Sequence, residues 1–470
     1  MNKTYHQQVH AIFKEVFAQQ STNIIKACEL GFTSVQSGKK FYVLGTGHSH
    51  MMPEEFFARL KGTDFFTPII MPEFMLHQFP HKSTVIERLA PYADIVLSLY
   101  PISEGDTMML VSNSGRNGLL VELAIKTKQA NANLITCVNH KQAKVITSRH
   151  SSGKNMADFA DVVIDNCGVF GDALHEIAEE LKVGSTSNMV TILIAQMMNA
   201  IMINLQKGKP ESNKSVLERF ETYFFEAFDQ TLTQSENVQK AAQLVFEAVQ
   251  RESKFFVYGG GHSHLVTEEL YSRAGGVPYI SPILEDEIMV HMSDNKSNLM
   301  ETSKEYAHIL MKKYGFKAND LILIASNSGK GKLTVELARI AKDAGLKVIA
   351  LTNVRQAKTA VSDHESGQLL AQIADVVIDN CAPVNDAAFM IQDRVCCPLS
   401  SSLALYLAQS LIVDLCYVMI ANGIMPPIAI SANVEDPKTD RQKELKEASR
   451  LARIKYASNY IYQGPKVKLG

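Results

Sequence analysis

The stretch Phe41–His50 reads FYVLGTGHSH, and Phe255–His264, 214 residues further on, reads FFVYGGGHSH. Two other pairs keep the same spacing: Ser112–Ala124 (SNSGRNGLLVELA) with Ser326–Ala338 (SNSGKGKLTVELA), and Asp161–Cys167 with Asp375–Cys381, which both read DVVIDNC. One offset that holds across so much of the chain indicates the duplication of a whole domain, because solenoid repeats have far shorter periods.

We therefore predict a first copy over residues 1–212 and a second over 213–470, which ends in a polar tail that is helical around Lys443–Tyr456. In each copy a helical lead-in, residues 5–37 or 215–251, precedes the first apolar strand, and strands then alternate with helices. This alternation predicts the α/β class, with a parallel sheet covered by helices on both faces.

The composition is that of a soluble globular protein, with 46% hydrophobic and 20% charged residues among 470. A formal net charge of -2 favours neither nucleic acid nor an acidic membrane as a partner. The seven cysteines form no C-x-x-C pair, which is typical of a reduced cytoplasm. Two apolar stretches, Met189–Leu205 and Leu403–Met419, are short for membrane spans and contain polar residues, so we expect buried helices and no membrane.

Two small-residue turns in each copy follow predicted strands and open helices. In an open parallel sheet, ligands bind at the carboxyl ends of the strands, and backbone N–H groups at a helix start favour an anion. The turn Ser112-Asn113-Ser114-Gly115 adds two hydroxyls at i and i+2. The alternative is that Ser114 only caps a helix, but the retention of both turns in both copies favours anion binding.

A strand ending in G-x-G-x-S and another ending in S-x-S-G resemble the sugar isomerase (SIS) domain family. Each copy is similar to single-domain SIS proteins that carry VSNSGRN and ADVVIDN, which are Val111–Asn117 and Ala160–Asn166 here. The resemblance implies a five-stranded, flavodoxin-like parallel sheet in each copy, a phosphosugar ligand and a homodimer of four SIS domains. In the family a threonine hydroxyl usually contacts the phosphate, and this chain has Asn117 and Gly331 at the matching positions. The ligand is therefore expected to carry either a phosphate or a different anion, such as a sulfonate.

Catalytic residues are expected among acids and histidines that both copies keep. Glu55 and Glu269 are the preferred bases, with Glu54 and Glu268 beside them on the helix after the glycine-rich turn, although acids also favour helix N-termini in general. The resemblance implies that His77 and His291 open the sugar ring, and Glu87 and Glu301 are second-rank candidates.

Ligand binding is assigned to the two turns and to the asparagine that ends the fourth strand. The residues are Gly45, Gly47, His48, Ser49, His50, Ser112, Asn113, Ser114, Asn117 and Asn139 in the first copy, and Gly259, Gly261, His262, Ser263, His264, Ser326, Asn327, Ser328 and Asn353 in the second. The H-S-H turns offer two possible metal ligands each, but no third ligand is evident in the sequence, so we expect neither metal nor cofactor.

The sequence thus predicts a cytoplasmic aldose–ketose isomerase of a phosphorylated or otherwise anionic sugar, with sites where the two copies meet. Two alternatives stay open: a phosphosugar lyase of the etherase type, and a regulatory protein that senses a phosphosugar without catalysis. The absence of a basic patch and of an N-terminal helix-turn-helix segment argues against a transcriptional version of the latter.

Overall fold

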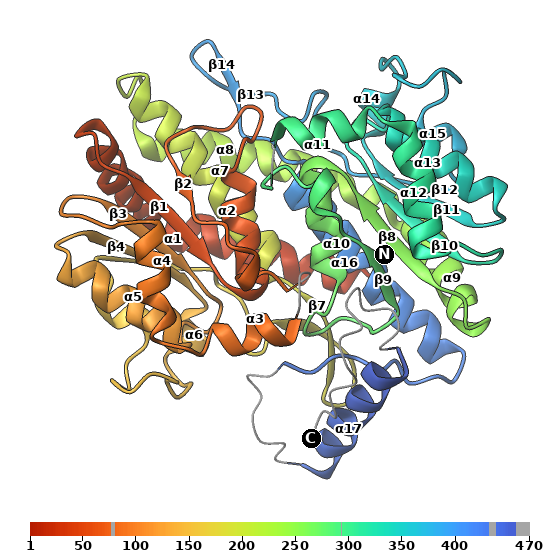
Figure 1. Cartoon of the computed structure of the whole chain (residues 1–470), viewed down its shortest axis with the longest axis horizontal. Coiled ribbons are helices and arrows are strands. Elements are labelled where there is room, and N and C mark those ends of the chain that lie inside the picture. Colours follow the sequence, from red (N-terminus) through yellow and green to blue (C-terminus); the bar gives the residue numbers. More distant parts are fainter. Residues whose placement is uncertain (77–79, 293, 432–438, 457–470) are drawn as a thin grey trace.

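The chain forms two parallel sheets of five strands each (Figure 1). The computed structural model describes residues 1–76, 80–292, 294–431 and 439–456. The first sheet has the order β2-β1-β3-β4-β5 and the second has the same order, β9-β8-β10-β11-β12. This is the flavodoxin-like order, so the predicted fold is confirmed. The strands are β1 Phe41–Gly45, β2 Thr67–Pro68, β3 Thr107–Val111, β4 Asn133–Val138, β5 Val162–Asp165, β8 Phe255–Gly259, β9 Ile280–Ile283, β10 Leu321–Ala325, β11 Lys347–Thr352 and β12 Val376–Asp379.

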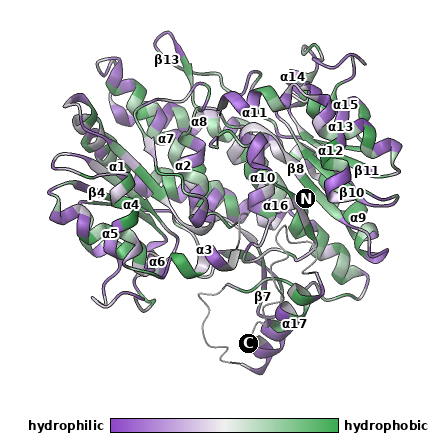
Figure 2. Ribbon diagram, viewed as in Figure 1, coloured by the Kyte–Doolittle hydropathy of each residue, from purple (hydrophilic) through white to green (hydrophobic). Residues whose placement is uncertain are grey.

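The central strands are continuously apolar because helices cover both faces of each sheet. Every residue of β1, β3, β8 and β10 is buried, and these strands are coloured as hydrophobic or neutral along most of their length in Figure 2. Gly45 pairs with Val111, and Gly259 pairs with Ala325. The glycine-rich turn and the serine turn of each copy therefore leave the sheet side by side.

The helices lie around the sheets and between them. Their bounds are α1 Lys3–Gln36, α2 Met51–Phe56, α3 Pro80–Ile86, α4 Tyr92–Leu99, α5 Gly118–Gln129, α6 His140–Ala143, α7 Ser187–Gln206, α8 Asn213–Gln230, α9 Ser235–Gln250, α10 His264–Leu270, α11 Asp294–Glu301, α12 Lys304–Tyr314, α13 Lys332–Asp343, α14 Val354–Ala357, α15 Leu370–Ile373, α16 Ser400–Ala421 and α17 Asp440–Lys455.

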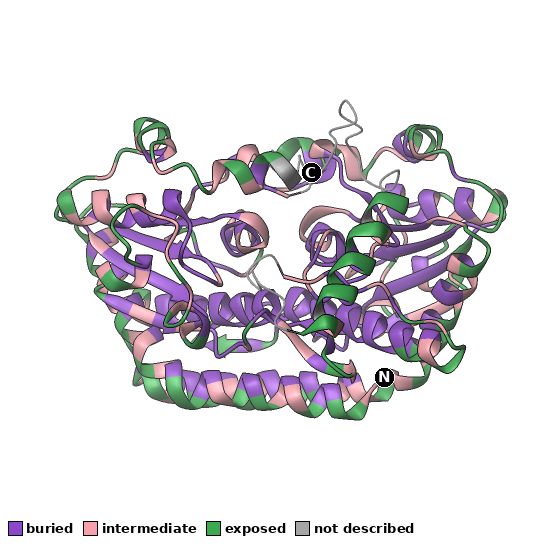
Figure 3. Ribbon diagram, turned by 90° about the horizontal axis from the view of Figure 1, so that it is seen from below, coloured by how far each residue is buried: buried purple, intermediate pink, exposed green. Residues whose placement is uncertain are grey.

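Helices α7 and α16 form the centre of the molecule. Both are long and apolar enough to cross a membrane by length and composition, but 94% and 83% of their most apolar windows are buried inside the protein. They contact one another and belong to one hydrophobic core that runs through both copies. Figure 3 shows these central helices and the sheets as buried, with exposed residues along the outer helix faces.

Two antiparallel hairpins were not predicted: β6 Ala173–Ala178 with β7 Leu181–Ser185, and β13 Phe389–Ile391 with β14 Arg394–Cys396. Each hairpin reaches the other copy. The amide of Gly184 donates to the carbonyl of Gly275 at 3.2 Å, and that of Cys397, just after β14, donates to the carbonyl of Lys61 at 3.3 Å. The hairpins therefore add contacts between the two copies.

The lead-in of the second copy also differs from the prediction. It is one helix in the first copy, α1, but two helices in the second, α8 and α9, with a tighter turn over Thr231–Gln234 between them. The Thr231 hydroxyl donates to the carbonyl of Phe228 at 2.5 Å. Such a bond from a threonine side chain to a nearby carbonyl competes with the backbone hydrogen bonds that would continue the helix.

Candidate functional site

Each glycine-rich turn packs tightly between the first strand and a short helix. In the second copy β8 ends at Gly259, a turn spans Gly261–Ser263, and α10 follows. A Cβ on Gly259 would lie 2.1 Å from the carbonyl oxygen of Ser263, and one on Gly45 would lie 2.1 Å from that of Ser49. Only glycine fits at these strand ends.

Gly259→Ala is expected to destabilise the protein by at least about 2 kcal/mol, because a backbone atom must move to make room for the new Cβ. Gly331→Ala is the matched control: φ is -61°, and the nearest atom to its Cβ would be Thr334 Oγ1 at 3.9 Å. Urea unfolding should show a change within about 1 kcal/mol for that variant. Equal stability of the two variants would contradict the close packing of the turn.

The serine turns are closed by their own first hydroxyl. Ser326 Oγ accepts a hydrogen bond from the amide of Gly329 at 3.2 Å, and Ser112 Oγ accepts one from Gly115 at 3.1 Å. Because each hydroxyl acts as acceptor here, its proton stays available for donation to an anion. The following helices begin only after Asn117 and Gly331, so the alternative that Ser114 caps the helix is wrong.

A cavity of about 590 Å³ opens over both turns of the second copy. Its lining includes Gly261, His262, Ser263, Ser326, Asn327 and Ser328, all from the predicted set. The first copy contributes Arg59, Leu60 and Lys61 to the same cavity, so the site lies where the two copies meet. The wall also includes polar residues that the sequence did not lead us to assign: Gln356, Asn380, Asn385, Asp386, Ser400 and Ser401.

The arginine on the wall crosses from one copy to the other. Arg59 Nη2 donates to Asp386 at 3.1 Å and to the hydroxyls of Ser400 and Ser401 at 3.2 and 3.1 Å. Arg273 of the second copy makes the equivalent contacts with the first copy: it donates to Asp172 at 2.7 Å and to Ser187 at 2.5 Å. The arginines, the aspartates and the pair Ser187/Ser401 are kept at the same offset of 214, whereas Ser400 corresponds to Thr186. That retention was the signal in the sequence that marked them.

Among the described residues, two acids line the cavity, and Glu301 is the one that is not paired with Arg59. It is the last residue of α11, it is half-buried, and its Oε1 lies 2.9 Å from where a Cβ on Gly260 would stand. Burial raises the pKa of Glu301 to about 7, against a smaller opposing effect of His264. Its counterpart Glu87 accepts a hydrogen bond from Thr46 Oγ1 at 3.2 Å, and burial raises the pKa of Glu87 to about 7 as well.

Glu55 and Glu269, the preferred bases of the sequence prediction, are instead fully buried in ion pairs. Glu55 lies 2.9 Å from Arg59 Nε and accepts from Gln196 Nε2 at 2.7 Å. Glu269 lies 3.5 Å from Arg273 Nε and accepts from Gln409 and Asn188 at 2.8 Å each. Burial raises the pKa of both carboxyl groups, that of Glu269 to about 7. Neither residue lines the cavity described above.

Glu54 and Glu268 face each other across the junction, together with histidines from both copies. His50 Nε2 lies 3.4 Å from Glu54 and 3.2 Å from Glu268, and His264 Nε2 lies 3.3 Å from Glu54. His291 Nδ1 lies 3.1 Å from Glu54. Burial opposes protonation of His50, but the two carboxylates outweigh it and raise the pKa of His50 to about 9. We call these five residues the axial cluster; His77, the counterpart of His291, lies outside the described residues.

Two pairs of predicted residues are engaged in contacts of the fold, although His262 also lines the cavity. His48 and His262 donate through Nε2 to carbonyls of the opposite copy, Tyr271 at 2.9 Å and Phe57 at 3.0 Å, and burial lowers the pKa of each well below its usual value. Asn139 and Asn353 do not line the cavity: their oxygens cap α6 and α14, and their amide groups donate to the carbonyls of Val169 and Ala382. Both functional groups of each asparagine are thus engaged, which leaves no evident role in reading sugar hydroxyls.

The two copies differ beside the serine turn. In the first, Asn117 Oδ1 accepts a hydrogen bond from Arg149 Nη1 at 2.8 Å, and Ser112, Ser114 and Asn117 are buried. In the second, Gly331 has no side chain, and Ser326 and Ser328 are half-buried. The second copy therefore presents the more accessible turn.

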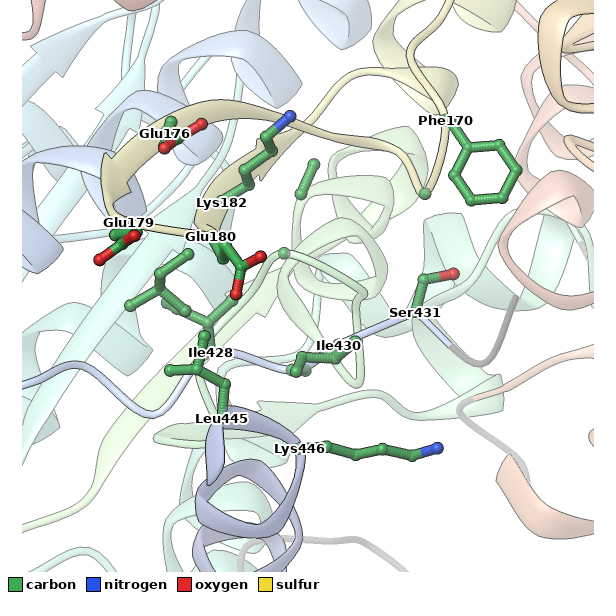
Figure 4. Close-up of a pocket in the computed structure, with 15 residues that line it drawn as sticks. Phe170, Glu176, Glu179, Glu180, Lys182, Ile428, Ile430, Ser431, Leu445 and Lys446 are labelled. Carbon is green, nitrogen blue, oxygen red and sulfur yellow. The ribbon is translucent and has the colours of Figure 1, made fainter. Parts of the chain in front are cut away.

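A separate cavity of about 420 Å³ lies between the β6–β7 hairpin and α17 (Figure 4). Glu176, Glu179, Glu180 and Lys182 of the hairpin line one side, and Ile428, Ile430, Leu445 and Lys446 line the other. It contains neither a glycine-rich nor a serine turn, so it is not the predicted site.

The chain is similar in sequence to proteins that are about as long as one copy. The UPF0309 protein BH3325 of Halalkalibacterium halodurans is 40% identical over 205 residues, which are 43% of this chain and 85% of that protein. The UPF0309 protein Teth39_1980 of Thermoanaerobacter pseudethanolicus is 34% identical over 230 residues, 48% of this chain and 92% of that protein. Each relative thus matches about the length of one copy.

A solved structure, the C-terminal domain of glucosamine-fructose-6-phosphate aminotransferase from Francisella tularensis, is similar with a TM-score of 0.50. It is 11% identical, and the similarity covers 90% of this chain and 98% of that one, which shows a shared fold. The family model of the SIS domain matches residues 4–138 and 220–353, more than half of the chain. The chain therefore belongs to the SIS-domain family and carries two SIS domains in tandem.

Proposed function

We propose that this protein is an aldose–ketose isomerase that acts on a phosphorylated or otherwise anionic sugar in the cavity of the second copy. The observation that carries the proposal is the position of Glu301. Its carboxyl group lies over the glycine-rich turn, lines the same cavity as Ser326 and Ser328, and has a pKa of about 7. A carboxylate with such a pKa is suited to move a proton between neighbouring carbons at neutral pH.

The serine turn is the proposed anion site. Ser326, Asn327 and Ser328 line the cavity at the carboxyl end of β10, and Asn380 and Gln356 hold the Asn327 side chain in place. With the anion there, the carbonyl end of an open-chain sugar extends toward Glu301 and the Arg59 side of the wall. Lys61 supplies positive charge near an enediolate intermediate, which carries a developing negative charge, whereas the charge of Arg59 is already offset by Glu55 and Asp386.

Glu301 replaces Glu269 as the proposed base because of the surroundings of the two groups. Glu269 is held by Arg273, Gln409 and Asn188 and has no exposed surface, whereas Glu301 is half-buried at the cavity. A base must come within hydrogen-bond distance of the proton that it removes. Glu87 takes the same role if the first copy is active.

Thermal unfolding with a panel of sugar phosphates, sulfonated sugars and the corresponding free sugars tests the binding step. We expect one sugar phosphate or sulfonate to raise Tm while its free sugar does not, because the charged group supplies the contacts with the serine turn. The Ser328→Ala variant should lose most of that shift. A shift with free sugars that matches the shift with their phosphates would contradict the anion site.

A further inference from the structure

The axial cluster of Glu54, Glu268, His50, His264 and His291 has no role in the proposed reaction. All five residues are buried, between 1% and 7% exposed, and none of them lines the cavity with Glu301. Two carboxylates and three imidazoles at the junction of two domains are costly to bury unless a charge balances them or a ligand joins them.

The histidine orientations show which nitrogen atoms face the carboxylates. His50 Nδ1 contacts the carbonyl oxygen of Gly47, and His264 Nδ1 contacts that of Gly261. A carbonyl oxygen only accepts, so each Nδ1 carries its proton, and Nε2 of a neutral ring then holds a lone pair. These lone pairs face carboxylate oxygens, which is repulsive unless a proton or a cation lies between them. Histidines that bind metals usually donate their other N–H to a backbone carbonyl in this way.

The separations within the cluster are close to those between ligands of one metal ion. Two ligands at about 2.0–2.2 Å from Zn²⁺ in tetrahedral geometry lie about 3.3–3.6 Å apart. Glu54 Oε1 lies 3.1 Å from His291 Nδ1, and Glu54 Oε2 lies 3.3 Å from His264 Nε2. Glu54, His264 and His291 each offer one ligand atom, and these atoms lie within 4.8 Å of one another.

We propose that Glu54, His264 and His291 bind one divalent transition-metal ion, with Zn²⁺ as the best match to two imidazoles and a carboxylate. Glu54 belongs to the first copy and both histidines belong to the second, so the ion links the two copies. The sequence led us to expect no metal because no third ligand was evident beside the two histidines of an H-S-H turn anywhere in the sequence. In the proposed site the third ligand belongs to the other copy, which spacing within one copy does not reveal.

Metal content of the purified full-length protein tests this inference. The protein is first stripped of metal with a chelator, then saturated with Zn²⁺ and freed of unbound ion. Elemental mass spectrometry should then find about one Zn²⁺ per chain, and Zn²⁺ added to the stripped protein should raise its Tm. His291→Ala should lower the bound Zn²⁺ at least tenfold and remove the Tm rise. His308→Ala is the matched control, because that histidine is exposed on α12 and its removal should change neither result.

Two results would overturn the inference. One is a wild-type protein that binds no Zn²⁺, Mn²⁺, Co²⁺ or Ni²⁺ under saturating conditions, which would mean that protons alone hold the cluster. The other is a folded His291→Ala variant that binds Zn²⁺ as tightly as the wild type. Neither readout depends on a sugar, so the metal site and the proposed isomerase fail independently.

Discussion

The double variant Glu87→Gln/Glu301→Gln is expected to lose at least about 10²-fold in kcat, because general base catalysis contributes about 10²–10⁴-fold. Glutamine keeps the shape and the hydrogen-bonding oxygen of the side chain but cannot take a proton. The measurement is the initial rate of aldose–ketose conversion of the sugar that the thermal screen identifies. Glu301→Gln alone should remove more than half of the rate, since the second copy has the more accessible serine turn.

The pH dependence adds a second readout to the same variants. The carboxylate form is the active base, and the pKa of Glu301 is raised to about 7, so kcat/KM of the wild type should rise with pH and level off above about 7. Glu305→Gln, an exposed change on α12, serves as the control and should keep the wild-type rate and profile. A double variant that turns over within fivefold of the wild type would remove Glu87 and Glu301 from the reaction.

Arg273→Met is expected to lower the free energy of unfolding by about 3–5 kcal/mol, because it leaves the buried carboxylates of Glu269 and Asp172 without their cation. Methionine keeps much of the apolar bulk, so the loss reports the charge. Arg59→Met, which unpairs Glu55 and Asp386, should act in the same way. The loss in free energy of unfolding should become smaller as pH falls, since the carboxyl groups that have lost their arginine take up protons and become neutral.

Urea unfolding of Arg219→Met provides the control for this pair of variants. Arg219 forms an exposed ion pair with Glu211, so its loss should cost no more than about 1 kcal/mol. Similar stabilities of Arg273→Met and Arg219→Met at neutral pH would show that the crossed arginines do not hold the two copies together.

The fold was readable from the sequence because its signals are local and repeated. Continuous apolar strands such as Phe41–Gly45 and Leu321–Ala325 mark a sheet buried on both faces, and the constant offset marks its duplication. Strand order then brings the glycine-rich and serine turns together, through the pairing of Gly259 with Ala325. The place in the fold where the two turns meet was therefore predictable.

The roles of individual acids could not be predicted from the sequence, because they depend on the direction in which each side chain points. Glu54 and Glu55 are adjacent, and neighbours on a helix point about 100° apart. One consequently enters the axial cluster and the other meets Arg59 and Gln196. Pairs such as Arg59 with Asp386 join residues more than 300 positions apart, and only their retention in both copies hinted at them.

Proton NMR of the candidate sugar phosphate in D₂O with the purified protein tests the central claim most directly. An aldose–ketose isomerase moves a proton between C1 and C2, so we predict solvent deuterium at those carbons together with formation of the ketose, both lost in Glu87→Gln/Glu301→Gln. A sugar phosphate that raises Tm but shows neither exchange nor ketose would contradict catalysis and favour a sensor. Release of a C3 substituent would instead identify a lyase.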